Sequence, residues 1–491
     1  GIWAGILVAV AAAGALRTGQ ERARLGEWDG LGLPPREARL TLRVERVFAT
    51  PPGEARAGGL ARVVGAEAHL RDLVGQRVQF SVNWPKAEGV ALRGVEFVAT
   101  GLLRPVPEWP EAGSFDRFLA DEGVNFAFTR GRLAGKPGEA GAWVRFCATA
   151  GARLEASLRS GLGGRLDGLG DLYVAMLLGK KQELSEGQQA LFIRSGTMHL
   201  FAVSGLHVAG IAMALNTLLA IVRVPGRVRF LVGTGVLWTF VEITGGSPSA
   251  VRAFWMVTCL LGAQQFRAPG NSLAALVTSA LGVLVVAPHQ LFSASFQMSY
   301  GIVAALLLYG VPLQEMWLER WRPWAILPRG EWRAWQHGVE AAGRGVISAV
   351  ALGLASVLVS TPATLAFFGL LTPGGFFVNL VLIPVSSLVL FAGVAAMLVG
   401  GMGWAGLASV FNHGAALVLA GMEGAVELAL RVPGMAWKAQ FVAPWCAPVA
   451  SAGMLALLAV GYARGWRARE GGYWLPFAVL GLGLVLTVRG V

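Results

Sequence analysis

Apolar and polar residues alternate in short runs near the start of the chain and give way to long apolar runs in the rest. Residues 1–16 are apolar, which favours an N-terminal membrane span. Residues 17–135 carry charges throughout, and apolar and polar positions alternate within them at 40–48, 61–70, 75–84 and 93–103. A period of two is typical of half-buried β-strands, so this part is predicted to form a small β-domain with its linker.

The number of short strands narrows the kind of β-domain. Turn-forming stretches such as PPGEARAGG and PKAEG separate the strands, and a loop, a short helix and a further strand are expected within 108–133. Four or five such strands suit a small barrel of the oligonucleotide/oligosaccharide-binding (OB) type. A generic small β-domain fits the pattern nearly as well.

Residues 136–170 are predicted to contain an amphipathic helix. Leu154, Leu158 and Leu162 lie along one side of it, with Arg153 and Arg159 beside them. Such a helix can lie on a bilayer surface or pack against other helices, and the sequence favours neither arrangement.

Residues 171–491 contain ten apolar runs, each near the ~20 residues that cross a bilayer. They lie at 197–222, 230–246, 250–266, 272–288, 295–313, 346–369, 376–399, 404–430, 447–463 and 473–489. With residues 1–16 they predict a polytopic α-helical membrane protein of about ten to eleven spans that carries an N-terminal β-barrel.

The charge distribution orients these spans. Only 14% of the residues are charged, and the net charge is +12. Lys and Arg concentrate in the loops at 223–229, 317–344 and 464–469, whereas the loops GGSPS and APHQ have none. The positive-inside rule places the basic loops in the cytoplasm and the β-domain on the extracytoplasmic side. The excess charge indicates either ordinary membrane anchoring or a polyanionic substrate.

The three cysteines are not spaced as a zinc site. Cys259 lies in an apolar run and is expected to be a small core residue. Cys147 and Cys446 both fall in segments predicted to lie outside the cytoplasm, so a disulfide between them is a candidate cross-link.

Polar residues interrupt the apolar run at 197–222. Ser204 and Gly205 resemble the start of a helix more than its middle, so we predict a break with a half-helix that begins near Leu206. The N-terminus of a half-helix inside a membrane suits an anion. In the alternative reading, Gly205 only allows close helix packing. His199 and His207 are eight positions apart and are not expected to share a metal ion.

Other polar residues stand in apolar runs. An arginine near the start of a helix opposes the helix dipole, so Arg252 is expected to face a phosphate or carboxylate. Gln297 lies near the outer end of a span, and Asn379 requires a polar partner within one. Asn412 is expected to form hydrogen bonds between helices.

Motifs of nucleotide hydrolysis and metal hydrolysis are missing from the sequence. It contains no G-x-x-x-x-G-K-[ST], and its histidines do not cluster as H-E-x-x-H. No catalytic residue, metal site or cofactor is therefore predicted, and a conduit is the leading interpretation. The alternative is a membrane-embedded enzyme in which His199 or His207 acts as acid or base on a lipid-linked or glycan substrate.

A signature segment and five further segments resemble ComEC-type competence proteins, in the same order along the chain. SGTMHLFAVSGLHVAGIAMAL (195–215) resembles the signature segment of that family, and LYVAMLLGKKQELSEGQQALFIRSGTMHL (172–200) resembles the approach to it. GSFDRFLADEGV (113–124), with Phe115 and Asp116, resembles the linker after the extracellular domain. GSPSAVRAFWM, SASFQMSYG and TPATLAFFGLLTPGGFFVNLVLIPV resemble later segments.

The resemblance implies an OB-fold domain outside a bacterial inner membrane, a membrane channel domain at 171–491, and transport of single-stranded DNA into the cytoplasm. It implies DNA and membrane lipids as partners, with a DNA-receptor protein outside and an ATP-driven translocase or single-strand-binding protein inside. Many members add a C-terminal metallo-β-lactamase-like domain. The sequence up to Val491 lacks its metal-ligand histidines, so another protein is expected to degrade the non-transported strand.

A channel reading assigns roles to the polar residues described above. The DNA path would be lined by His199, Ser204, Gly205, His207, Arg252, Gln297 and Asn379, and bases would stack on Phe201, Phe254, Trp255 and Phe296. A third interpretation is a scaffold that docks other DNA-uptake components through the β-domain.

Overall fold

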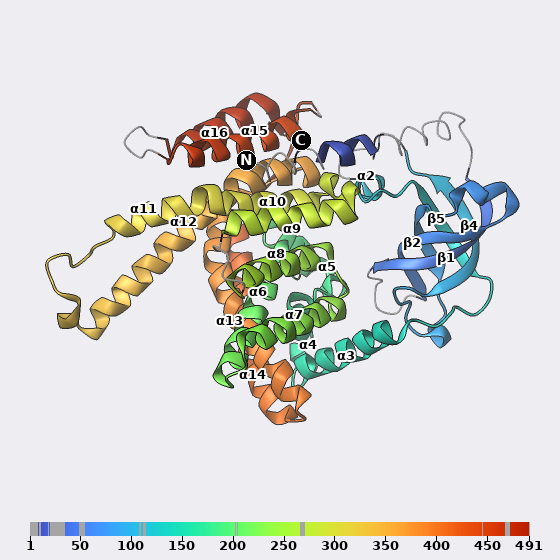
Figure 1. Ribbon diagram of the computed structural model, residues 1–491, viewed down its shortest axis with the longest axis horizontal. Helices are drawn as coiled ribbons and strands as arrows, with labels where there is room; N and C mark the ends of the chain where they lie inside the picture. The colour runs from blue at the N-terminus through green and yellow to red at the C-terminus, as the bar shows by residue number, and fades with distance from the viewer. Residues whose placement is uncertain are drawn as a thin grey trace.

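The protein consists of a β-barrel at one end of a large helical bundle (Figure 1). The computed structural model describes residues 8, 11–17, 19, 35–48, 55–107, 110, 114–201, 203, 205–265, 271–443, 445–466 and 472–490. Ser204 therefore lies outside the described residues, as does much of the apolar segment 1–16.

The barrel is closed by five strands in the order β1-β2-β3-β5-β4. The strands are β1 (Arg36–Phe48), β2 (Arg56–Ala66), β3 (Arg77–Asn83), β4 (Glu96–Pro105) and β5 (Phe126–Leu133). All neighbours pair antiparallel except β3 and β5, which are parallel. Each alternating run predicts a strand that the structure contains, because alternation places one residue in two in a shared core around Phe80, Trp84 and Phe97.

One helix lies between the barrel strands β4 and β5 and contacts the bundle, and a second helix follows β5 into the bundle. Helix α2 (Phe115–Asp121) begins at Ser114, whose side chain accepts a hydrogen bond from the Arg117 amide. Helix α3 (Ala142–Arg159) occupies the predicted amphipathic segment and packs against α7, α13 and α14. Its buried side thus has protein partners, and its contact with a bilayer surface stays a prediction.

The bundle itself is built from the helices that follow α3. They are α4 (Asp167–Leu178), α5 (Glu186–Arg194), α6 (Gly205–Ile221), α7 (Gly226–Ile243), α8 (Pro248–Gln265), α9 (Ser272–Val286), α10 (Ala294–Ala305), α11 (Val311–Arg320), α12 (Ala334–Phe368), α13 (Gly375–Gly401), α14 (Ala405–Leu430), α15 (Cys446–Ala463) and α16 (Leu475–Thr487). A π-helical segment, Leu306–Gly310, joins α10 to α11.

Length and composition identify this chain as a multi-pass membrane protein. Within the described residues, five helical segments are long and apolar enough to cross a bilayer: Ala294–Arg320, Ala334–Phe368, Gly375–Gly401, Ala405–Leu430 and Cys446–Ala463. Three shorter apolar helices accompany them, at His207–Ile221, Ser272–Val286 and Leu475–Thr487. The total of ten or eleven spans stays a prediction.

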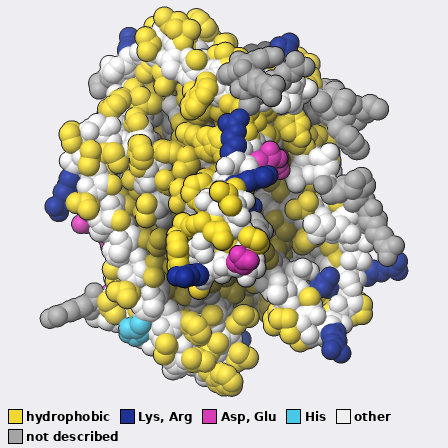
Figure 2. Space-filling model, turned by 90° about the vertical axis from the view of Figure 1, so that its left-hand side faces the viewer, with side chains coloured by type: hydrophobic (Ala, Val, Ile, Leu, Met, Phe, Trp, Pro, Cys, Tyr) yellow, Lys and Arg dark blue, Asp and Glu magenta, His cyan; other side chains and the backbone are white. Residues whose placement is uncertain are grey.

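The α11–α12 hairpin projects from the end opposite the barrel (Figure 1). Hydrophobic side chains cover much of this face, with Lys and Arg side chains between them and at the rim (Figure 2). Three short strands, β6 (Leu370–Leu371), β7 (Trp437–Phe441) and β8 (Val488–Gly490), form a small sheet in the order β6-β7-β8.

The structure corrects two sequence predictions. The three cysteines are free thiols, so Cys147 and Cys446 are not joined: Cys147 is buried in α3 and Cys446 begins α15. The predicted span 197–222 is shorter than expected, because a 3₁₀ turn (Met198–Phe201) precedes α6 and the helix itself begins only at Gly205.

An ion pair fastens the barrel to the bundle. Arg93 Nη2, in the loop between β3 and β4, donates to Glu242 Oε2 near the end of α7 at 2.6 Å. The Glu242 side chain is only 6% exposed. Arg93→Ala leaves this carboxylate buried without its cation, so we expect a loss of about 1–3 kcal/mol of stability. The apparent melting temperature of the detergent-solubilised protein measures the loss.

Two further variants control this prediction. Arg43→Ala breaks a pair with Glu96 that is exposed on both sides and lies within the barrel, so it should cost well under about 1 kcal/mol. Arg93→Ala/Glu242→Gln should recover most of the loss, because no buried charge remains. Equal melting temperatures for Arg93→Ala and Arg43→Ala would contradict the fastening role.

Candidate functional site at the junction of barrel and bundle

The polar stretch before α6 forms a tight turn. Gly196 has a φ of +72°, which favours glycine, and a Cβ there would lie 3.1 Å from Thr372 Oγ1. Ser195 Oγ and Thr197 Oγ1 are 2.7 Å apart, and both residues are buried. The turn therefore packs against the connection between α12 and α13.

Helix α6 begins one residue from the start predicted by the Ser-Gly break. Gly205 is its first residue, and a Cβ built on Gly205 meets nothing within 4 Å. Close helix packing therefore does not explain this glycine. The segment before the break is a single 3₁₀ turn rather than a half-span.

The two histidines lie on either side of the break, near each other. His199 is exposed, and its Nδ1 lies 3.2 Å from the Gly196 carbonyl oxygen. His207 is 2% exposed on α6, close enough for an electrostatic interaction with His199. Among the described residues, no group of three or more His, Cys, Asp or Glu side chains is placed to hold a metal ion.

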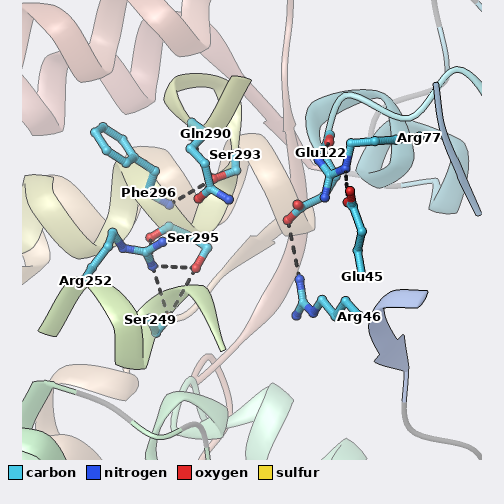
Figure 3. Close-up of polar contacts among 10 residues, drawn as sticks. All are labelled: Glu45, Arg46, Arg77, Glu122, Ser249, Arg252, Gln290, Ser293, Ser295 and Phe296. Carbon is cyan, nitrogen blue, oxygen red and sulfur yellow. Dashed lines mark hydrogen bonds and ion pairs between the residues drawn. The ribbon is translucent and has the colours of Figure 1, made fainter. Parts of the chain in front are cut away.

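Arg252 is the most deeply buried cation of the bundle. It lies in the second turn of α8 and is 1% exposed. Its Nη2 donates to Ser295 Oγ at 2.6 Å, to the Ser295 carbonyl at 2.8 Å and to Ser249 Oγ at 3.1 Å (Figure 3). Nε and Nη1 are buried without a hydrogen-bond partner, and no carboxylate in the described chain forms an ion pair with Arg252. This guanidinium thus has hydrogen-bonding capacity for an anion.

The barrel presents Arg46 and Glu122 to the same region (Figure 3). A bulge in β1 pairs Val44 with Ala61 and Arg46 with Leu60 and leaves Glu45 between them. Arg46 Nη1 lies 3.7 Å from Glu122 Oε1, and the charge of Glu122 also acts on Arg252. The barrel thereby adds a carboxylate and a cation to the surroundings of Arg252.

Two cations at the junction are partly desolvated. Burial lowers the pKa of Arg46, and the nearby Glu122 carboxylate opposes this effect. Burial also lowers the pKa of Lys181, and the positive charge of Arg46 lowers it further. Lys181 in turn interacts electrostatically with His199. We call Arg46, Glu122, Lys181, His199 and Arg252 the junction site.

Gln297 and Asn379, like Gly205 and His207, are predicted path residues that lie outside the junction site. Gln297 is exposed on α10, and its Nε2 donates to the Leu291 carbonyl at 3.1 Å. Asn379 lies in α13, and its Oδ1 is buried without a hydrogen-bond partner in the described chain. These amides are not hydrogen-bonded to the junction site, so their place along a DNA path stays a prediction.

The predicted stacking residues differ in accessibility. Trp255 is 44% exposed, whereas the three phenylalanines are buried against other rings. Ring centroids are 4.4 Å apart for Phe201 and Phe192, 5.0 Å for Phe254 and Trp238, and 4.6 Å for Phe296 and Tyr300. The buried rings would have to leave these clusters to stack on a base.

The residues of the predicted linker close one end of the barrel. Arg104 at the end of β4 donates to both carboxylate oxygens of Asp116, at 2.7 and 3.2 Å. Phe115 is 53% exposed and stacks on Phe118, with ring centroids 5.8 Å apart. Asp116 therefore orients α2 on the barrel.

Pattern analysis alone does not predict Arg46, Glu122 or Lys181 as site residues. Charged residues are common in their segments, so none of them stands out by type. The bulge at Glu45 sets the direction in which the Arg46 side chain points. The alternation of apolar and polar residues in the sequence does not reveal where a bulge lies.

Comparisons with known proteins agree with this architecture. Residues 176–466, more than half of the chain, match the family model described as Competence protein. The chain is 28% identical over 145 residues to ComE operon protein 3 of Bacillus subtilis, covering 29% of this chain and 18% of that protein. It is 28% identical over 230 residues to Recombination protein 2 of Haemophilus influenzae, covering 45% of this chain and 27% of that protein. The match thus spans less than a third of either relative, and no solved structure matches the chain.

Proposed function

The chain belongs to the competence protein family, and from this premise we propose that it forms the inner-membrane channel through which single-stranded DNA enters the cytoplasm in natural transformation. The names of its two relatives, a ComE operon protein and a recombination protein, support a role in DNA uptake. In this proposal the protein is a conduit and not an enzyme.

The main observation behind the proposal is that the guanidinium of Arg252 is buried and only partly hydrogen-bonded. A buried guanidinium inside a membrane domain is costly unless an anion satisfies it, and here serine oxygens contact only Nη2. A passing phosphate could bind the open Nε and Nη1 side as a bidentate pair. Arg252 is 1% exposed, so the path beside it is closed in this conformation and must open for transport.

The barrel and the loop charges supply the sidedness of the proposal. We assign the barrel to the OB type because of its five closed strands, and we place it outside the cytoplasm because Arg223, Arg227 and Arg229 lie at the opposite end of α7 from the barrel contact. A DNA receptor would then deliver the strand to the barrel. A cytoplasmic translocase or single-strand-binding protein would withdraw it.

A transport assay tests the proposal directly. The protein is reconstituted into liposomes that contain single-strand-binding protein as an internal trap, and a labelled 60-nucleotide single strand is added outside. We expect the single strand to become protected from external nuclease and a duplex of the same sequence to stay sensitive, because a duplex requires a wider path. Empty liposomes with the same trap are the control.

The outcomes separate the rival functions. Absence of protection, together with normal assembly of other uptake proteins on the barrel in cells, would indicate a scaffold. Turnover of a lipid-linked substrate without DNA, lost on replacement of His199, would indicate an enzyme. Either result would contradict the channel.

A further inference from the structure

A cavity of about 620 Å³ opens on the barrel, away from the junction site residues. Its lining includes three arginines, Arg56 of β2 and Arg130 and Arg132 of β5, together with the polar side chains of Ser81 and Asn83. No acidic or aromatic residue of the described chain lines it. The cavity therefore combines positive charge with neutral hydrogen-bonding groups and has no means of stacking on a base.

Its three arginines are exposed and uncommitted. None of their side chains forms an ion pair or a hydrogen bond with another part of the described chain, although the side chains of several other barrel arginines do. An arginine cluster without carboxylates is unfavourable in isolation, because like charges repel each other. An anionic ligand would relieve this repulsion.

Strand pairing places the lining residues in a row. Arg56 lies opposite Asn83, and Asn83 lies opposite Arg132, so the three side chains occupy neighbouring strands on the outer face. Across two strand spacings the row extends over about 10 Å. A row of this kind suits a chain of anionic groups better than a single one.

A β-bulge in β5 creates this row. Phe126 and Phe128 point into the barrel core, so strict alternation would direct Arg130 and Arg132 into the core as well. Two residues of β5 separate Thr129 from Arg132, whereas only one residue of β4 separates the two positions with which they pair. The extra residue in β5 forms a bulge, and this bulge turns Arg132 outward.

The bulge has a strained backbone and little free volume. Arg130 has a φ of +52°, a left-handed conformation that is uncommon for residues other than glycine. A Cβ on the next residue, Gly131, would lie 2.6 Å from Val82 Cγ2, so only glycine fits there. Strained positions of this kind often mark a functional site, and here the strain serves to present two arginines on one surface.

We propose that this cavity binds the sugar-phosphate backbone of a single nucleic acid strand, independently of its base sequence. The arginines would pair with successive phosphates, while Ser81 and Asn83 donate to phosphate oxygens. The inference rests on the proposed function and deepens it, because it gives the barrel a capture site that precedes the junction site.

Binding of a labelled oligonucleotide tests this site. Full-length protein in phosphatidylcholine nanodiscs is titrated with a fluorescein-labelled 20-nucleotide oligothymidylate between 50 and 300 mM salt. We expect Arg56→Gln/Arg132→Gln to weaken binding about tenfold and to reduce the slope of log K against log salt by about 1.4, since each phosphate contact on a single strand contributes about 0.7. Oligothymidylate and a mixed sequence should bind equally.

The matched control removes the same charge elsewhere. Arg43→Gln/Arg71→Gln replaces two exposed barrel arginines outside the cavity and should leave the slope within experimental error. Equal slopes for the two double variants, or no binding by the wild type, would overturn the proposed site. The liposome transport assay decides separately whether the channel proposal stands.

A second arm distinguishes strand phosphates from lipid phosphates. If lipid headgroups fill the cavity, phosphatidylglycerol in the nanodiscs should weaken oligonucleotide binding by the wild type but not by Arg56→Gln/Arg132→Gln. That result would overturn the proposal. An equal effect of phosphatidylglycerol on both proteins supports the strand as the ligand.

Discussion

Arg252→Met should reduce DNA uptake about 30-fold while the protein stays about as stable as the wild type. The wild-type guanidinium is buried with Nε and Nη1 unpartnered. Removing this buried charge also removes its desolvation cost, which offsets the loss of its hydrogen bonds to Ser249 and Ser295. Loss of a buried contact to phosphate costs about 2 kcal/mol or more, which corresponds to roughly a 30-fold decrease in transport.

Transformation frequency measures this effect, in a naturally competent strain that lacks its own family member and expresses this chain. Arg252→Lys keeps the charge but not the planar fork, so it should be intermediate. Thr258→Val, a change of nearly equal volume two turns along the same helix, should transform normally. Normal transformation by Arg252→Met at wild-type protein levels would contradict the role of Arg252 in the DNA path.

Asn412→Asp should destabilise the bundle more than any other single substitution discussed here. Asn412 in α14 is fully buried, and its Nδ2 donates to the carbonyl oxygens of Ser157 and Ser160 at 2.8 and 2.9 Å. These carbonyls belong to the C-terminal end of α3, where the Ser160 amide is 3.3 Å from the Ser157 carbonyl and the helix end carries partial negative charge. A carboxylate would replace two hydrogen bonds with repulsion, at a cost of about 4 kcal/mol or more.

Thermal exposure of the buried thiol of Cys147 reports on the attachment of α3. Detergent-solubilised protein is heated with a thiol-reactive dye, and the transition temperature is recorded. Asn412→Leu should lower the free energy of unfolding by about 2–3 kcal/mol. Both carbonyls lose the amide donor of Asn412, but no charge is added to the buried site. Ser409→Ala, a change at a half-buried residue one turn earlier on α14, removes no hydrogen bond to α3 and should behave nearly as wild type. The prediction fails if Asn412→Asp and Ser409→Ala unfold at the same temperature.

Both substitutions concern residues that the sequence marks by type. A polar side chain in an apolar run needs a partner, so residue type and position are enough to single out Arg252 and Asn412. Their partners could not be predicted. Ser295 lies 43 positions from Arg252, and Ser157 lies 255 positions from Asn412, and no local pattern encodes pairings over such distances.

The junction site also contains some residues that the sequence marks by type and others that it does not. His199 and Arg252 stand out in apolar surroundings, whereas Arg46 and Lys181 are ordinary charged residues in charged segments. Packing of the barrel against the bundle brings Arg46 and Glu122 near Arg252. This packing depends on contacts such as Arg93 with Glu242, which join residues 149 positions apart.

By itself the sequence determined the β-domain, the apolar helices and the start of α6 near the Ser-Gly break, because alternation, apolar length and helix-breaking residues are local properties. Only the tertiary structure decided the parallel pairing of β3 with β5, the bulges at Glu45 and Arg130, and the free state of Cys147 and Cys446. Strand register and cysteine separation depend on contacts between distant segments. A one-residue bulge reverses the direction of every later side chain in its strand, so the arginine-lined cavity follows from that register and not from the order of residues alone.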